Sequence, residues 1–320
     1  MSTDLAAPGW LGFGGAGIGN LYKEMNDGVA AATVEAAWSG GVRYFDTAPH
    51  YGLGLSERRL GAAVRDKPRG DFLLSTKVGR VLETNPAAEP GDMDDQGFAV
   101  PATTRRRWDP SEAGIRRSIE DSLDRLGLDR IDIAYLHDPD VYDLEEGISQ
   151  ALPALLKLRG EGIVASIGVG SNSAEALTEC VNRADLDLVM LAGRYTLLEQ
   201  PAAAELLPAC KRRGTGVVNV GVYNSGLLAR PEVPHNAHYN YAPAPAAILQ
   251  KARALADVCR SFGVELPTAA LQFSMRHPAV RSVVVGASSP AQMDQIVARA
   301  AEEIPEALWD ELERQGMIPS

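Results

Sequence analysis

The sequence predicts a (β/α)8 barrel (a TIM barrel), and two observations support this prediction. Short apolar runs alternate with longer amphipathic stretches along all 320 residues, as in parallel sheets with helices packed outside. Seven of these runs are typical of buried strands, and a segment near residues 10–13 supplies an eighth. Eight strands favour a closed barrel over an open sheet. The length fits a single barrel domain over residues 1–320.

The expected elements follow one another in strand-then-helix order. The expected strands are residues 10–13, 42–45, 72–76, 131–136, 163–169, 186–191, 216–220 and 280–285. The expected helices are residues 27–39, 56–64, 111–126, 144–159, 174–183, 200–213 and 267–276. Ser111 and Gly127 have the residue types of a helix start and a helix end, and Ser56 is a candidate N-cap for the second helix.

Two long segments, residues 79–108 and 224–245, interrupt the alternation. The first is rich in Pro, Asp and Gly, and the second groups His235, His238, Tyr239 and Tyr241. Connections of this length in a compact domain usually have a function. Each follows the C-terminal end of an expected strand, which is where barrel active sites lie. We therefore expect both to be long loops that contribute to a substrate site.

Charge and composition exclude several classes of partner. The formal net charge of −11 repels nucleic acid and anionic membranes, so we expect neither as a partner. Cys180, Cys210 and Cys259 have no CxxC spacing, and no His, Asp or Glu cluster has metal-ligand spacing. The first residues have neither a basic nor an apolar region, so we expect no secretory leader, and no 18-residue apolar run is present. We expect a cytoplasmic protein with free thiols and no metal; the sequence contains no signal for an oligomeric state.

Four polar residues lie at or just after the ends of successive expected strands: Asp46, Tyr51, Lys77 and His137. In a barrel these strand ends meet at one mouth. A free tyrosine has a pKa near 10, which a neighbouring ammonium lowers, while a carboxylate keeps that lysine charged. A histidine beside them donates a hydrogen bond to a substrate oxygen. The set suits proton transfer coupled to hydride transfer, and hydride transfer requires a cofactor.

Each of these residues also has an ordinary structural interpretation. Taken alone, Tyr51 is an aromatic residue in a turn, Asp46 is a turn residue and His137 caps a strand end. Their joint occurrence at successive strand ends is what favours the chemical interpretation.

Several motifs resemble those of the aldo-keto reductases. YFDTAPHYG at residues 44–52 followed by Ser56-Glu57, STK at 75–77, residues 118–128, LH at 136–137 and IGVGSN at 167–172 match features of that family over nearly the whole chain. The resemblance implies a (β/α)8 barrel and a catalytic tetrad. The tetrad positions match Asp46, Tyr51, Lys77 and His137. The resemblance also implies a substrate-facing role for His50, with Trp108, Arg194 and Tyr223 as further substrate-binding candidates.

Ten residues match positions that bind the nicotinamide cofactor in the family: Ser171, Asn172, Asn224, Ser225, Gly226, Gly286, Ala287, Ser288, Ser289 and Gln292. Family members that prefer NADP commonly have a lysine and an arginine where this chain has Gly286 and Gln292. A 2′-phosphate without cationic partners binds weakly. The resemblance therefore implies NAD in preference to NADP, bound in part by the helix start near Pro290.

The chain departs from the family pattern at two positions of the nicotinamide site. Ala192 stands where a glutamine is usual, and the stacking aromatic aligns with Val220 or Val222, so that Tyr223 is the candidate replacement. Arg194 has two interpretations, as a substrate or loop anchor and as a structural ion pair.

The motifs HDPD at 137–140, GRYTLL at 193–198, NSG at 224–226 and YAPAP at 241–245 resemble bacterial NAD-dependent aldose 1-dehydrogenases. This group includes L-fucose and D-threo-aldose dehydrogenases, with pyridoxal 4-dehydrogenase as a relative. The resemblance implies oxidation of a small hydroxylated substrate, an aldose at C1 to its lactone, with Tyr51 as general base. The alternatives are oxidation of the pyridoxal hemiacetal, an NADPH-dependent carbonyl or aldehyde reductase, and a cofactor-sensing regulatory protein on the same barrel. A metal-dependent hydrolase has no support in the ligand spacing.

Overall fold

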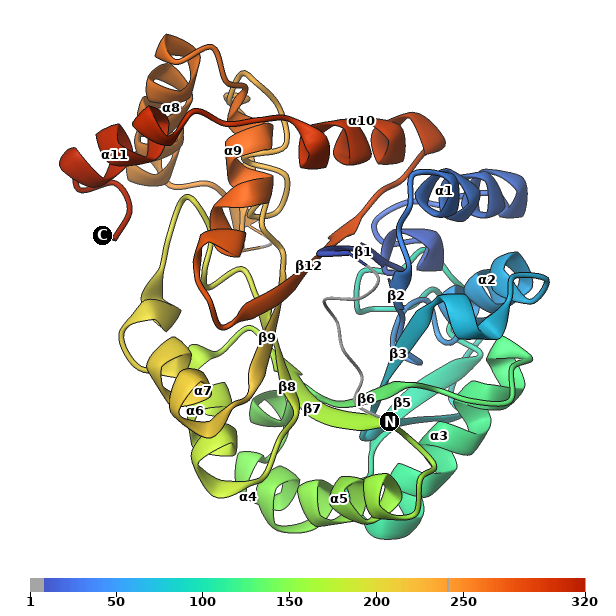
Figure 1. The fold of residues 1–320 in the computed structure, drawn as a ribbon. Helices are drawn as coiled ribbons and strands as arrows, with labels where there is room; N and C mark the ends of the chain where they lie inside the picture. Colours follow the sequence, from blue (N-terminus) through green and yellow to red (C-terminus); the bar gives the residue numbers. More distant parts are fainter. Residues whose placement is uncertain (1–8, 241, 320) are drawn as a thin grey trace.

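The computed structural model of the chain describes residues 9–240 and 242–319, and eight parallel strands in it form a closed barrel (Figure 1). Around the barrel the order is β1-β12-β9-β8-β7-β6-β3-β2, and β1 closes the ring by pairing with both β12 and β2. The strands are β1 (Leu11–Gly14), β2 (Tyr44–Asp46), β3 (Leu73–Val78), β6 (Ile133–His137), β7 (Ser166–Ser171), β8 (Leu188–Ala192), β9 (Gly216–Val220) and β12 (Val280–Gly286). The predicted fold class is confirmed.

The helices form a ring outside the barrel (Figure 1). They are α1 (Asp27–Ser39), α2 (Leu55–Val64), α3 (Glu112–Leu126), α4 (Leu144–Glu146), α5 (Leu152–Gly160), α6 (Ala174–Arg183), α7 (Leu206–Arg213), α8 (Ala246–Ser261), α9 (Leu266–Gln272), α10 (Pro290–Ala301) and α11 (Glu306–Arg314). In α3, Ser111 caps the start by accepting a hydrogen bond from the Gly114 N–H, and Gly127 ends the helix at φ 64°. Both predicted boundaries are confirmed.

Several expected bounds are wrong, and burial explains why. The strands expected from residues 131, 163 and 186 begin at Ile133, Ser166 and Leu188. Ile131 and Leu186 are buried before strand pairing starts, so an apolar run marks burial and not pairing. The helix expected over 144–159 is divided by a π-helical turn at residues 147–151, and α8 and α11 were not predicted.

Side chains alternate between the inside and the outside of the barrel, and this alternation places the polar strand ends. On β6, Ile133 and Tyr135 belong to the inner cluster, whereas Ala134 and Leu136 pack toward the helices. His137 continues the inner series with the two-residue period of a strand. The same period on β2 and β3 puts Tyr44 and Asp46, and Leu73, Ser75 and Lys77, on the inner face.

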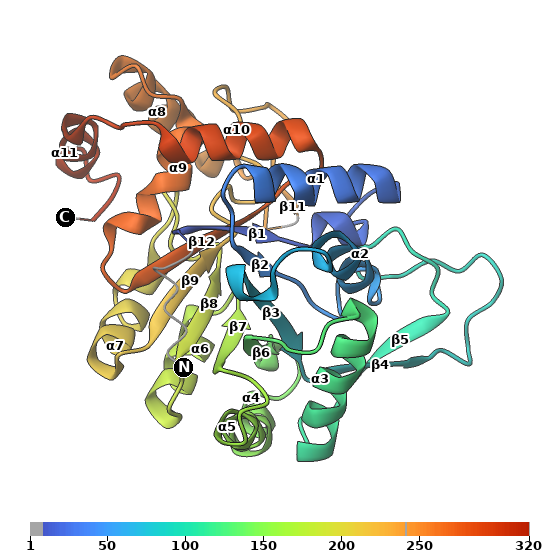
Figure 2. The ribbon, with the colours of Figure 1, turned by 45° about the vertical axis from the view of Figure 1, so that its right-hand side comes forward.

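The two interruptions differ from the long loops that the sequence predicts. Residues 79–108 contain an antiparallel hairpin of β4 (Arg80–Thr84) and β5 (Thr104–Trp108), which projects from the barrel beyond β3 (Figure 2). Residues 224–245 contain the short pair β10 (His238–Tyr239) and β11 (Ala242–Pro243). Tyr241, which the sequence analysis grouped with this segment, lies outside the described residues. Across the described ranges, no helix combines the length and apolar character needed to cross a membrane.

Candidate active site

The barrel brings the four predicted residues together at one end. Lys77 Nζ donates a 2.6 Å hydrogen bond to Asp46 Oδ2 and a 3.0 Å bond to the Thr47 carbonyl. The same Nζ lies 4.6 Å from the centroid of the Tyr51 ring. The Tyr51 and His137 rings meet edge to face, with centroids 5.9 Å apart. Lys77 and Asp46 are almost completely buried, so their interaction is poorly screened by solvent.

Burial changes the predicted electrostatics of Tyr51. Burial raises the pKa of Tyr51 and is the largest effect on it, while the charge of Lys77 lowers the pKa. The ammonium thus lowers the pKa of Tyr51 as expected, but burial outweighs it and the net direction is upward. Burial alone would lower the pKa of Lys77, but Asp46 and Tyr51 together raise it above its ordinary value. Lys77 therefore stays an ammonium at neutral pH.

Two neutral histidines lie beside Tyr51. Burial, followed by the charge of Arg80, lowers the pKa of His137 well below its ordinary value, and the same two causes lower that of His50 to about 2. Arg80 Nη1 lies 3.2 Å from His50 Nδ1, and because a guanidinium has only donors, Nδ1 accepts and the His50 proton is on Nε2. The two imidazole rings are 5.3 Å apart. His137 is therefore a neutral imidazole at neutral pH.

Arg80 and Asp138 complete this end of the barrel, and neither is among the residues predicted from the sequence. Arg80 Nη2 donates a 2.5 Å hydrogen bond to Asp138 Oδ2, which lies 3.5 Å from His137 Nε2. Both follow predicted site residues closely, Arg80 three positions after Lys77 and Asp138 directly after His137. Their closeness to a strand end was the feature of the sequence that could have identified them as site residues.

The turn that presents Tyr51 is fixed from two sides. The candidate cap Ser56 is wrong, because the α2 N-cap is Gly54; the Ser56 hydroxyl instead hydrogen bonds with Thr47 and donates to the Gly15 carbonyl. On the other side, Arg106 forms a buried ion pair with Asp94 and donates to the His50 carbonyl at 2.8 Å. These contacts join the hairpin segment to the turn.

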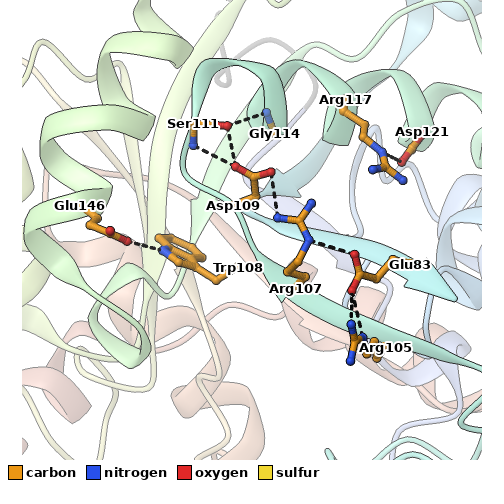
Figure 3. Close-up of polar contacts among 10 residues, drawn as sticks. All are labelled: Glu83, Arg105, Arg107, Trp108, Asp109, Ser111, Gly114, Arg117, Asp121 and Glu146. Atoms are coloured by element: carbon orange, nitrogen blue, oxygen red, sulfur yellow. Dashed lines mark hydrogen bonds and ion pairs between the residues drawn. The ribbon is translucent and has the colours of Figure 1, made fainter. Parts of the chain in front are cut away.

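Trp108 lies at the end of β5, beside a second aromatic residue. Its indole N–H donates to Glu146 at 3.3 Å (Figure 3). Its ring stacks on Tyr142 with centroids 4.8 Å apart and an interplanar angle of 5°. Farther along the hairpin, toward its tip, Glu83 pairs with Arg105 and Arg107 from the neighbouring strand, which ties β4 to β5 (Figure 3).

Several of the expected cofactor-binding residues line one groove between the β9–α8 segment and α10. Its volume is about 560 Å³, and its lining includes Ser225, Gly226, Gly286 and Gln292. Ser225 and Gly226 lie about sixty positions before Gly286 and Gln292 in the sequence, so it is the fold that brings the two pairs to one groove. Tyr223 also lines this groove, together with two basic residues that the sequence analysis missed, Arg230 and Arg299.

The start of α10 is organised around Gln292. Ser289 caps the helix, and its hydroxyl accepts the Gln292 N–H at 3.3 Å. The N–H and the hydroxyl of Ser288 both donate to Gln292 Oε1 at 2.8 Å. Ala287 is buried just before this turn. The helix begins at Pro290, as predicted.

The remaining predicted residues form a network that joins three segments. The Ser171 hydroxyl donates to Asp140 at 2.7 Å, while the Asn172 side chain is exposed. Arg194 donates to the Asn172 carbonyl at 2.9 Å and pairs with Glu199 at 3.3 Å. Asn224 and Tyr239 also donate to Glu199, at 3.1 and 2.7 Å. Arg194 therefore both anchors a loop, through the Asn172 carbonyl, and forms a structural ion pair with Glu199.

No metal-binding arrangement accompanies these residues. In the part of the chain that the structure describes, no group of three or more His, Cys, Asp or Glu side chains is placed to hold a metal ion. The three cysteines are buried and free.

The chain is similar over nearly its whole length to a known family and to known proteins. The model of the aldo/keto reductase family matches residues 10–315. D-threo-aldose 1-dehydrogenase from a Pseudomonas species is 53% identical, covering 100% of this chain and 97% of the relative. Pyridoxal 4-dehydrogenase from Microbacterium luteolum is 39% identical over 96% of this chain and 94% of the relative.

Solved structures agree with this assignment. The holo form of an aldo-keto reductase from Bacillus halodurans superposes with a TM-score of 0.73 and 26% identity, covering 95% of this chain and 91% of that one. Glycerol dehydrogenase from Gluconobacter oxydans has the same fold, with a TM-score of 0.74, 22% identity, and 97% and 93% of the two chains covered. The chain therefore belongs to the aldo/keto reductase family, whose members are nicotinamide-dependent oxidoreductases.

Proposed function

We propose that this enzyme oxidises an aldose at C1 to the corresponding lactone, with NAD as the hydride acceptor and Tyr51 as the general base. The observation that carries the proposal is the buried Lys77–Asp46 pair, whose ammonium lies 4.6 Å from the Tyr51 ring. This arrangement provides a proton acceptor with a fixed positive charge beside it. The 53% identity to a D-threo-aldose 1-dehydrogenase supports an aldose as the substrate.

The side chains have complementary roles in this reaction. Tyr51 takes the proton of the C1 hydroxyl while the C1–H bond breaks and its electron pair leaves as hydride. The C1–O bond then becomes the lactone carbonyl. Lys77 stabilises the deprotonated form of Tyr51, and Asp46 keeps Lys77 charged and in place. Neutral His137 donates a hydrogen bond to the reacting oxygen and fixes its position.

The cofactor supplies an electrophilic ring carbon that accepts the hydride. We assign its binding to the groove lined by Ser225, Gly226, Gly286 and Gln292, with further contacts from Ser171, Asn172, Asn224 and the start of α10 at Ala287, Ser288 and Ser289. Gln292 is neutral, and its Oε1 already accepts two hydrogen bonds from Ser288. This neutral position supports NAD in preference to NADP, because a 2′-phosphate needs cationic partners.

The remaining assignments concern the other predicted residues and the location of the enzyme. Two residues are proposed to line the substrate site. One is His50, which lies between Arg80 and His137, and the other is Trp108, which stacks on Tyr142. Arg194 is proposed to act through the Glu199 network that anchors residues 224–240, and Tyr223 to contact the cofactor from its place in the groove. The three buried free thiols are compatible with a reducing, cytoplasmic location.

The experiment is a substrate panel. Purified enzyme is incubated with NAD or NADP and L-fucose, D-arabinose, L-galactose or pyridoxal, and NAD(P)H formation is followed by absorbance. We expect NADH formation with at least one aldose and a lactone as the product. If pyridoxal is oxidised more efficiently than every sugar, the enzyme is a pyridoxal dehydrogenase, as its 39% identical relative is. Turnover with NADP but not NAD would contradict the cofactor assignment.

A further inference from the structure

Asp138 and Arg80 lie beside the proposed catalytic residues, but the reaction as written uses neither. Asp138 Oδ2 is 3.5 Å from His137 Nε2 and accepts a 2.5 Å hydrogen bond from Arg80. The Asp138 side chain is 28% exposed and that of Arg80 only 6%. The carboxylate is therefore the member of the pair that a ligand reaches.

Arg80 is committed to protein contacts and holds this carboxylate in place. Its other terminal nitrogen donates to His50 Nδ1 at 3.2 Å, and the guanidinium lies 5.3 Å from the centroid of the Tyr142 ring. Asp138 itself has a left-handed backbone conformation, at φ 44°, and its N–H donates to the Gly170 carbonyl at 2.8 Å. Aspartate tolerates this conformation better than most non-glycine residues, and the bond to Gly170 fixes it here. The carboxylate is thus rigidly placed next to His137.

The chemistry of a carboxylate limits what it binds. Within the described residues, the Arg80 bond and the His137 contact both use Oδ2, which leaves Oδ1 for a ligand. An ionised carboxylate only accepts hydrogen bonds, so the ligand group must be a donor. The reacting oxygen itself is assigned to Tyr51 and His137. The donor must then be on an atom next to the reacting carbon.

We infer that Asp138 accepts a hydrogen bond from a hydroxyl on the carbon adjacent to the one that is oxidised, and that Arg80 positions it for this contact. The inference rests on the proposed function. It narrows the substrate class to lactols, the cyclic forms of aldoses, that have a free hydroxyl at C2. A substrate without this hydroxyl leaves Oδ1 of a partly buried carboxylate without a partner, which costs more than an absent contact in water. The pyridoxal hemiacetal has no such hydroxyl on a saturated adjacent carbon.

The test compares each sugar with the same sugar lacking its 2-hydroxyl: L-fucose with 2-deoxy-L-fucose, and D-arabinose with 2-deoxy-D-ribose. For the wild-type enzyme we expect kcat/KM to fall about 10- to 100-fold on loss of this hydroxyl, as for a hydrogen bond to a charged group. In Asp138→Ala the penalty should largely disappear, because the acceptor is gone. Any intrinsic effect of the 2-hydroxyl on lactol reactivity remains in both enzymes, so the difference between them isolates the contact.

Further variants separate recognition from folding. Asp138→Asn keeps the side-chain shape and should give an intermediate penalty, and Arg80→Met should reduce the penalty without changing the dissociation constant for NADH. Glu83→Gln is the matched control, because it removes a hairpin carboxylate that pairs only with Arg105 and Arg107 among the described residues. It should retain the full penalty.

The possible failures are distinguishable. Oxidation of a sugar and of its 2-deoxy form with equal kcat/KM overturns the assignment of Asp138 and leaves the proposed function intact. A penalty that persists unchanged in Asp138→Ala does the same. If no sugar of the panel is oxidised, the proposed function fails and the inference fails with it.

Discussion

Ser75 donates a 2.6 Å hydrogen bond to Oδ1 of Asp46, on the carboxylate whose other oxygen accepts from Lys77. The Ser75 hydroxyl also hydrogen bonds with Tyr44 at 3.1 Å, and Tyr44 with Tyr135 at 3.2 Å. All of these groups are buried inside the barrel. The orientation of the lysine–aspartate pair therefore depends on a polar chain in the barrel interior.

Replacement of Ser75 by alanine should lower kcat without weakening NADH binding. Without the bond to Oδ1, the Asp46 carboxylate is free to rotate and Lys77 moves relative to Tyr51. We expect kcat to fall about tenfold to hundredfold, the usual cost of a small misplacement in an active site. Steady-state kinetics and NADH titration measure both quantities.

The control for this variant is Thr76→Val. Thr76 is the next residue on β3, but its hydroxyl points outward and donates to Glu57 at 2.8 Å. This variant should lose stability with little change in kcat. Equal loss of kcat in both variants would mean that Ser75 acts only through the stability of the barrel.

Tyr51→Phe should remove most of the turnover and leave cofactor binding intact. The substitution deletes only the phenolic oxygen that is proposed to take the substrate proton. Loss of a general base costs about 10²–10⁴-fold in rate. Single-turnover kinetics and NADH fluorescence titration measure the two effects. The control is Tyr195→Phe, because Tyr195 packs against Phe273 and His277. Full activity in Tyr51→Phe would refute the role of Tyr51 as the general base.

The rate of oxidation should increase with pH through the alkaline range. Burial raises the pKa of Tyr51 above its ordinary value, so the residue is protonated at neutral pH and the basic form grows as pH rises. The pKa values of His50 and His137 are lowered, so both are neutral above pH 6 and neither should add an inflection there. A profile of kcat/KM from pH 6 to pH 10 tests both statements. An inflection of kcat/KM near pH 6.5 would show that a histidine titrates during catalysis.

Gly52→Ala should disturb the turn that presents Tyr51. Gly52 has φ 61°, and a Cβ there would lie 2.1 Å from the Gly19 carbonyl oxygen, which belongs to the backbone. We expect a loss of about 1–3 kcal/mol in unfolding free energy, as for other overpacked sites, together with a lower kcat. Urea unfolding and steady-state kinetics provide the measurements.

Gly91→Ala is its matched control. Gly91 also has a positive φ, 96°, but a Cβ there would meet no atom within 4 Å. This variant therefore places a side chain at a positive φ, as Gly52→Ala does, but its Cβ clashes with no neighbouring atom. If it lowers kcat as much as Gly52→Ala does, the Gly19–Gly52 contact is not what positions Tyr51.

Gln292→Arg combined with Gly286→Lys should increase the use of NADP. The double variant supplies the two cations that a 2′-phosphate lacks at these positions. The ratio of kcat/KM for NAD to that for NADP should exceed one in the wild-type enzyme and fall in the variant. Arg230 and Arg299 line the same groove, so a wild-type ratio below one would indicate that these residues already bind the phosphate.

The sequence predicted the elements whose patterns are local. Residues 27–39, 174–183 and 216–220 have the bounds expected of them, because their apolar period and end residues lie within the element itself. α8 was missed although its buried Ala252, Leu255, Ala256 and Cys259 have helical spacing. The hairpin at residues 80–108 was missed because its paired strands have no apolar alternation and carry the side chains of Glu83, Arg105 and Arg107, which form ion pairs across it.

By itself, the sequence determined the barrel and the four polar strand ends, because strand alternation and strand order follow from residues close together in the chain. Only the tertiary structure decided three properties of the site. Burial outweighs Lys77 in setting the direction of the Tyr51 pKa. The pairing of Arg80 with Asp138 joins residues 58 positions apart, and the Ser75–Asp46 bond joins two strands. Solvent exclusion and these pairings arise only when distant segments pack together. A local sequence pattern therefore cannot predict them.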